Sequence, residues 1–154
     1  MSRLSPPEES WKRLYILSAA MSAAGVAVSA YLIDSEQVLS SGFCEVGSRI
    51  TCVDVLLSPY ASFMGIPTAA YGLAWFMAAL TLSILSTRLE KTRKPLLAWS
   101  IIGLLGIAAL VYVELAIINA LCLFCTAAHI LGVGIFAASY IAYVSWHESL
   151  EQDS

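Results

Sequence analysis

The chain has 154 residues, of which 59% are hydrophobic and only 12% are charged, and its formal net charge is −3. A soluble domain is about 45–50% apolar and about 25% charged, and a chain this short leaves too much surface exposed to hide the excess. The composition therefore excludes an ordinary soluble domain and predicts that the chain lies in a lipid bilayer. The net negative charge gives no sign of the basic surface that binds nucleic acid.

Four apolar segments are long enough to cross a bilayer, which takes roughly 20 residues of helix. They cover residues of about 14–33, 68–86, 95–118 and 121–145. Backbone groups in hydrocarbon must find hydrogen-bond partners within their own segment, so segments of this length are predicted to be helices. No polar linker divides the chain, and we predict one all-α membrane domain over residues 1–154, a bundle of four transmembrane helices.

Lysine and arginine gather on one side of the predicted bundle. Positive residues favour the cytoplasmic side of a membrane. Only Arg49 lies in the loop 34–67, whereas the other positive residues precede the first helix or connect the second to the third: Arg3, Lys12, Arg13, Arg88, Lys91, Arg93 and Lys94. The charge pattern predicts a multi-pass cell-membrane protein with both termini in the cytoplasm and the loop 34–67 outside.

The second half of this outer loop is apolar on either side of Ser58 and Pro59. An apolar stretch beside a membrane favours a short amphipathic helix at the interface, and we expect one near residues 53–63. The Gly65-Ile66-Pro67 run predicts a turn into the second long helix. Pro67 is expected near the first position of that helix, where a missing N–H costs nothing.

All four cysteines fall on the predicted outer side. Cys44 and Cys52 lie in the loop with seven residues between them, and Cys122 and Cys125 form a C-L-F-C motif at the start of the fourth helix. Disulfide chemistry persists outside the cytosol and is rare within it. The charge pattern and the cysteine positions are independent observations, and both place this end of the bundle outside.

The two residues of the C-x-x-C pair are expected to differ in reactivity. With Asn119 as the N-cap of the fourth helix, Cys122 would lie in its first turn, where free backbone N–H groups and the helix dipole favour a thiolate. Cys125 lies nearly one turn deeper in the bilayer. The pattern predicts that Cys122 faces exchange on the aqueous side while Cys125 faces a lipid-soluble oxidant.

Other interpretations use the same cysteines. Two structural disulfides would need no further chemistry, as in a four-span scaffold protein, although the outer loop lacks the tryptophan typical of one such class. A C-x-x-C pair is also half of many zinc sites. The outward location and the wide spacing of the loop pair disfavour a metal. We therefore predict a redox relay made of two cysteine pairs and no metal.

The chain also resembles the vitamin K epoxide reductase family, including its bacterial and archaeal members, over residues of roughly 14–144. The resemblance rests on Cys44-x7-Cys52, on Ser58 six residues after Cys52, on the run from Ser58 to Pro67, and on Cys122-x-x-Cys125. It implies that two electrons pass from a thioredoxin-like partner through both pairs to a quinone of the ubiquinone, menaquinone or vitamin K type. No thioredoxin-like domain is fused here, so the partner is expected to be a separate chain.

The resemblance also implies roles for the cysteines and for part of a quinone pocket. Cys44 would meet the partner, Cys52 would exchange with Cys122, and Cys125 would face the quinone. Ser58 would help to position the quinone ring, and Phe63 and Thr68 would line the pocket. Thr68 stands where mammalian members have asparagine, which counts against epoxide handling.

Two further ionisable residues are candidates. His129 lies four residues after Cys125 on the same helical face, where mammalian members have tyrosine. It would donate a hydrogen bond or a proton to the quinone, or else serve as a core histidine. Glu114 lies near the outer end of the third helix, and its carboxyl group either belongs to a site or reaches the interface.

The implied function is a thiol–quinone oxidoreductase that supports disulfide-bond formation. The alternative enzyme is a vitamin K epoxide or quinone reductase that recycles a quinone through the same relay. The cysteines alone do not separate the two.

Overall fold

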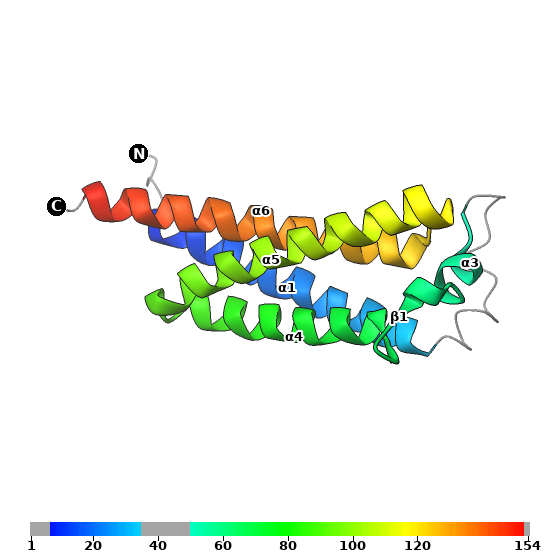
Figure 1. Cartoon of the computed structure of the whole chain (residues 1–154). Helices are drawn as coiled ribbons and strands as arrows, with labels where there is room; N and C mark the ends of the chain where they lie inside the picture. The colour runs from blue at the N-terminus through cyan, green and yellow to red at the C-terminus, as the bar shows by residue number, and fades with distance from the viewer. Residues whose placement is uncertain (1–6, 35–49, 153–154) are drawn as a thin grey trace.

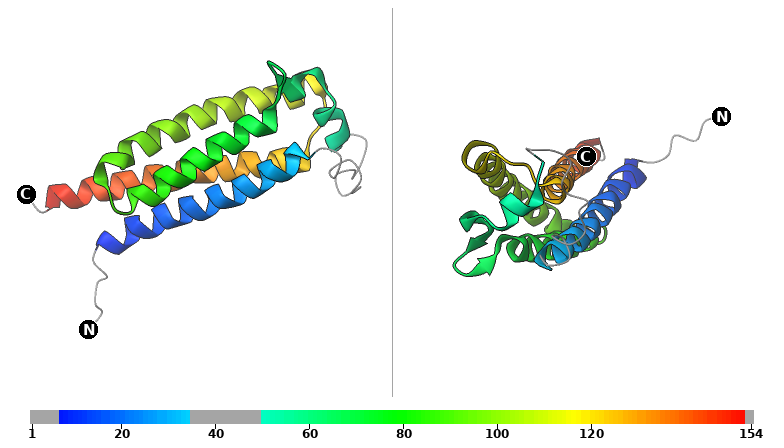
Figure 2. Two further views of the ribbon diagram at one scale, coloured as in Figure 1. Left: turned by 90° about the horizontal axis from the view of Figure 1, so that it is seen from below. Right: turned by 90° about the vertical axis from the view of Figure 1, so that its right-hand side faces the viewer.

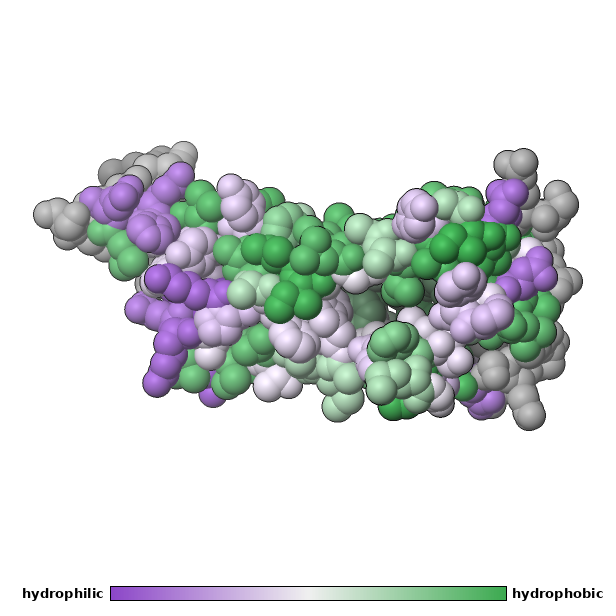
Figure 3. Space-filling view, in the orientation of Figure 1, coloured by the Kyte–Doolittle hydropathy of each residue, from purple (hydrophilic) through white to green (hydrophobic). Residues whose placement is uncertain are grey.

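A computed structural model describes residues 7–34 and 50–152. Four long helices lie side by side: α1 (Pro7–Ile33), α4 (Thr68–Ser86), α5 (Arg93–Tyr112) and α6 (Leu123–Gln152) (Figure 1). Each contains a segment long and apolar enough to cross a membrane. Figure 3 shows an apolar surface between polar ends, as a bilayer requires. The prediction of an all-α bundle with four spanning helices is confirmed.

The bundle has two distinct ends. The start of α1, the end of α6 and the short 3-10 turn η2 (Glu90–Thr92) between α4 and α5 lie at one end, which we call the basic end. Helix α3 (Cys52–Leu56) and the start of α6, which directly follows Cys122, lie at the other end, which we call the cysteine end (Figure 2). Helix α1 packs against both α4 and α6, and α5 packs against α6. The two described terminal segments thus lie at the same end of the bundle.

Buried Arg93 holds the basic end together. Its guanidinium carbon lies 4.1 Å from the ring centroid of Trp11 and 4.6 Å from that of Trp146. Its Nε donates a hydrogen bond to the carbonyl of Ser86 at 3.3 Å. A guanidinium between aromatic faces is stabilised by cation–π attraction, most strongly where water is excluded. This one side chain therefore connects all four long helices.

Residues 50–67, which the sequence predicts to lie outside the membrane and which we call the outer segment, contain less helix than the sequence predicts. Helix α3 (Cys52–Leu56) is followed by the 3-10 turn η1 (Pro59–Ala61) and by two paired strands, β1 (Ser62–Phe63) and β2 (Ile66–Pro67). The expected helix near 53–63 is thus correct only in its first part. Proline disfavours helical backbone at the residue before it, and Ser58 is extended with ψ of 153°.

The hairpin turn and the start of α4 follow from local chemistry. Met64 and Gly65 both have positive φ, 53° and 79°, as a tight two-residue turn between antiparallel strands requires. Pro67 is the N-cap residue of α4, one position before the place predicted for it. The hairpin and α3 lie across the cysteine end of the bundle (Figure 1).

The connection between the third and fourth long helices also differs from the prediction. Helix α5 continues as a π-helical stretch, η3 (Val113–Ile118), which Asn119 ends in the left-handed conformation with φ of 59°. Asparagine tolerates this conformation better than most residues, and it commonly ends helices. Asn119 is therefore a C-cap and not the N-cap of α6, whose first residue is Leu123.

Candidate functional site

A short backbone bridge brings the two cysteine-bearing segments together. Ile50 pairs in parallel with Leu121, and the N–H of Thr51 donates to the carbonyl of Leu121 at 3.1 Å. Cys52 lies two residues after Ile50, and Cys122 directly follows Leu121. The bridge therefore sets the register in which the two cysteines meet.

Three sulfur atoms form a continuous row. The Sγ atoms of Cys52 and Cys122 lie 3.2 Å apart, and the Cys125 thiol donates a hydrogen bond to the Sγ of Cys122 at 2.6 Å. Cys52 is disulfide-bonded, whereas Cys122 and Cys125 are free. Cys44, predicted to meet the partner and to pair with Cys52, lies outside the described residues. The row brings together the other three predicted cysteines.

Cys122 is the N-cap residue of α6 and not part of its first turn. Its Sγ accepts the backbone N–H of Cys125 at 3.2 Å, and its carbonyl accepts that of Thr126 at 2.9 Å. This is the geometry in which serine or aspartate usually caps a helix. The hydrogen bond from the Cys125 thiol, helped by the N–H groups of Cys125 and Phe124, lowers the pKa of Cys122 against the opposing effect of burial. The arrangement favours the nucleophilic thiolate.

Apolar side chains surround this sulfur row. Cys52 and Cys122 are fully buried in a cluster that includes Leu32, Val55 and Ala120. Cys125 packs against the same cluster but is only half-buried. The surroundings exclude water from the Cys52–Cys122 contact and leave Cys125 as the sulfur that faces the adjacent cavity.

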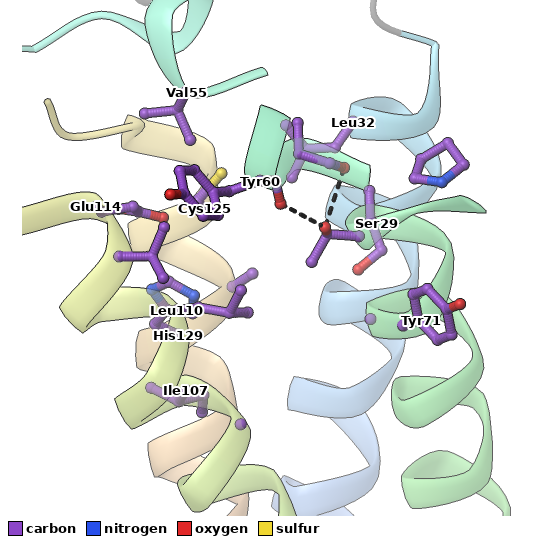
Figure 4. A pocket seen from close by; sticks show the side chains of 18 of the residues that line it. Ser29, Leu32, Val55, Tyr60, Tyr71, Ile107, Leu110, Glu114, Cys125 and His129 are labelled. Atoms are coloured by element: carbon purple, nitrogen blue, oxygen red, sulfur yellow. Dashed lines mark hydrogen bonds between the residues drawn. The ribbon is translucent and has the colours of Figure 1, made fainter. Parts of the chain in front are cut away.

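A cavity of about 520 Å³ lies beside Cys125 among α1, α4, α5 and α6, under the outer segment. Its lining is mainly apolar, and its volume falls within the range of small-molecule sites. Figure 4 shows Glu114, Cys125 and His129 on one wall with Ser29 and Tyr71 opposite. The surface is hollowed between α4 and α5 toward the cysteine end (Figure 3). The sulfur row therefore ends at a cavity in the apolar part of the bundle.

Three of the four predicted pocket residues line this cavity. They are Ser58, Thr68 and His129. The Oγ1 of Thr68 donates to the carbonyl of Ala61 at 2.9 Å, and the Oγ of Ser58 donates to that of Val55 at 2.7 Å. Both hydroxyl groups thus hold the outer segment in shape above the cavity.

Phe63, the fourth predicted pocket residue, does not line the cavity. Its side chain is 66% exposed, and its ring packs edge-on against Tyr71 with centroids 6.3 Å apart. The positive-φ turn after it belongs to the hairpin, and Phe63 lies on the exposed strand β1. Tyr71 occupies the cavity wall instead.

Several lining residues lack any motif that would predict them. Ser29 of α1, which is buried, lines the cavity. Tyr71 and Trp75 of α4 line it as well. These helices carry no cysteine. The spacing of their cavity-facing residues in the sequence is the same as that of any packed helical face. Within residues 7–34 and 50–152, no group of three His, Cys, Asp or Glu side chains is arranged to hold a metal ion.

Comparison with known protein families adds an independent finding. Residues 16–140 match the vitamin K epoxide reductase family. The matched region contains the sulfur row, the cavity and most of the four spanning helices. The chain therefore belongs to the vitamin K epoxide reductase family and is a multi-pass membrane oxidoreductase.

Proposed function

We propose that this protein is a membrane thiol–quinone oxidoreductase. It takes two electrons from a separate thioredoxin-like protein and passes them through two cysteine pairs to a quinone. The observation that carries this proposal is the row formed by Cys52, Cys122 and Cys125, which leads from a disulfide to an apolar cavity. A quinone is an apolar, lipid-soluble ring, which this cavity suits.

Electrons enter at the outer pair by thiol–disulfide exchange. A thiolate of the partner attacks the Cys44–Cys52 disulfide and forms a mixed disulfide with Cys44. The second thiol of the partner then releases the partner in its oxidised form, which leaves Cys44 and Cys52 as thiols. The partner in turn supplies disulfides to secreted proteins.

The second exchange passes the electron pair to the inner cysteines. The Cys52 thiolate attacks Cys122 of the Cys122–Cys125 disulfide and releases the Cys125 thiolate. The Cys44 thiolate then attacks Cys52 of the mixed disulfide, which re-forms the outer disulfide and releases Cys122. The Sγ–Sγ distance of 3.2 Å falls within the roughly 3–3.5 Å of a near-attack arrangement. Disulfide-bonded Cys52 beside two free thiols corresponds to the state after this step and before quinone reduction.

The cavity beside Cys125 is the proposed quinone site. Ser58 and Thr68 shape its roof, and His129 faces it one turn below Cys125. The quinone is of the ubiquinone, menaquinone or vitamin K type, and it enters from the bilayer through the hollow between α4 and α5. His129 donates a hydrogen bond to the ring. With the basic end in the cytoplasm, the cysteine end faces the oxidising side of the cell membrane.

The test uses the purified chain in lipid nanodiscs with menadione or ubiquinone-1. Reduced thioredoxin and dithiothreitol serve as two alternative electron donors. We expect thiol oxidation and quinone reduction in equal amounts, and loss of both in Cys122→Ala and Cys125→Ala. Ser139→Ala, a buried substitution on α6 that does not line the cavity, should retain activity. Full quinone-dependent thiol oxidation in both folded cysteine variants would contradict the relay.

A further inference from the structure

Glu114 is a carboxyl group inside the proposed quinone cavity. It is only 5% exposed, and it lines the cavity together with Cys125 and His129. Figure 4 shows its carboxyl group beside Cys125 on the same wall. Among the residues that the structure describes, no lysine or arginine lines the cavity. A carboxyl group buried without a cation beside it is least costly in its neutral form, which carries a proton.

The π-helical stretch η3 determines where this carboxyl group lies. The N–H of Ala120 donates to the carbonyl of Glu114 at 3.1 Å, which closes the wide turn before α6. The backbone N–H of Cys122 donates to the carboxyl group of Glu114. The side chain is therefore held between the reactive cysteine and the cavity. Such π-helical segments occur often at functional sites.

We propose that Glu114 is the acid that protonates the quinone. This inference rests on the function proposed above and adds a catalytic residue to it. The neutral carboxyl group delivers its proton to one carbonyl oxygen of the ring as the electron pair of the inner thiols enters it. The carboxylate that remains accepts the N–H of Cys122 and regains a proton from the thiols as they become a disulfide.

The net step balances in atoms and electrons. Two S–H bonds of Cys122 and Cys125 are broken and one S–S bond is formed, so the two cysteines lose two electrons and two protons. The quinone gains both electrons and both protons and becomes a hydroquinone with two hydroxyl groups. Glu114 carries one of these protons and is unchanged after each turnover.

The other ionisable groups on the cavity wall are less suited to this role. Tyr71 donates its hydroxyl proton to the carbonyl of Phe63 at 3.2 Å. Tyr60 belongs to the exposed η1 turn. His129 lies one helical turn below Cys125 and faces the deeper part of the ring site. Glu114 is thus the acid beside Cys125, and His129 is placed to serve the opposite carbonyl oxygen.

The test compares Glu114→Gln with Glu114→Asp in nanodiscs, with menadione as the acceptor. Glutamine keeps the size and the hydrogen bond from Cys122 but loses the acid. General acid catalysis contributes about 10²–10⁴-fold, so we expect kcat to fall about 100-fold in Glu114→Gln, with KM for menadione within about 3-fold. Glu114→Asp should recover most of that loss. Ser100→Ala, a buried substitution on α5 away from the cavity, should match the unaltered protein.

Two further readouts separate an acid from a structural residue. In the unaltered protein, kcat should fall at alkaline pH as Glu114 loses its proton, and this fall should be absent in Glu114→Gln. The ratio of kcat in H₂O to kcat in D₂O should differ from that of the unaltered protein in Glu114→Gln but not in Ser100→Ala. Disulfide exchange between Cys52 and Cys122 should proceed normally in Glu114→Gln, which shows that the variant is folded.

The outcomes distinguish the two proposals. An active unaltered protein together with Glu114→Gln of equal kcat would overturn the role of Glu114 and leave the relay standing. Equal losses in the Gln and Asp variants with an unchanged pH profile would also overturn it, in favour of a packing role. An unaltered protein that oxidises thiols without reducing menadione would overturn both.

Discussion

The Sγ atoms of Cys52 and Cys122 lie 3.2 Å apart, although 70 positions separate the two residues in the chain. The bridge between Ile50 and Leu121 holds the two segments in this register. The capped start of α6 then points the second sulfur of the C-x-x-C pair at the cavity. The order of the proposed relay thus depends on backbone pairing as much as on cysteine chemistry.

The first prediction concerns this contact. With Cys44 and Cys125 both changed to alanine, Cys52 and Cys122 should form a mixed disulfide under oxidising conditions, because no other thiol competes with either. Mass analysis of the linked peptides would show it. The matched variant with Cys44 and Cys122 changed to alanine should cross-link much less, since Cys122 is the sulfur in contact with Cys52. Equal cross-linking in both would contradict the proposed order.

The second prediction concerns the acidity of Cys122, measured with Cys44 and Cys52 both changed to alanine. Its pKa is lowered chiefly by the hydrogen bond from Cys125, so its thiolate should persist to lower pH than that of a free cysteine near pKa 8.5. Adding Cys125→Ala removes the main cause and should move the titration to higher pH. Thiolate absorbance in the ultraviolet measures the shift. An unchanged midpoint would show that the helix start alone sets the acidity.

The third prediction concerns stability at the basic end. Arg93→Met removes the cation between Trp11 and Trp146 and the hydrogen bond to the end of α4. Cation–π contacts that exclude water contribute about 2 kcal/mol, so the variant should unfold at a clearly lower temperature in detergent. The unfolding temperature of Arg93→Lys should lie between those of Arg93→Met and the unaltered protein, because an ammonium group keeps the charge but loses the planar stacking. Lys94 is the exposed neighbour of Arg93, and Lys94→Met should change the unfolding temperature little.

The fourth prediction concerns the contact between α4 and α5. The indole N–H groups of Trp75 and Trp99 each donate to the other's backbone carbonyl, at 3.4 and 3.2 Å. A Cβ added at Gly103 would run into the Trp75 ring, whereas one at Gly106 would meet nothing within 4 Å. Gly103→Ala should therefore lower the unfolding temperature without quinone. Gly106→Ala should leave the unfolding temperature unchanged or raise it slightly, because alanine is more favourable than glycine within a helix by about 1 kcal/mol.

The length of α3, the role of Asn119 and the position of Phe63 are three local features that the sequence does not determine. The apolar residues on either side of Pro59 predict a longer helix than α3, because the pattern does not show that the backbone is extended at Ser58. Asn119 suits both an N-cap and a left-handed C-cap, and only the path of the backbone distinguishes the two roles. The family resemblance implies that Phe63 lines the pocket, but the hairpin leaves Phe63 exposed and Tyr71 lines the cavity instead.

The sequence by itself determined the membrane class, the four spans and the two cysteine pairs. Composition, segment length and C-x-x-C spacing are local properties, and bilayer thickness and helix capping act on them directly. Only the tertiary structure decided that Cys122 is the sulfur facing Cys52 and that Glu114 joins Cys125 at the cavity. Those relationships depend on the Ile50–Leu121 pairing and the left-handed turn at Asn119, where segments far apart in the chain meet in one register.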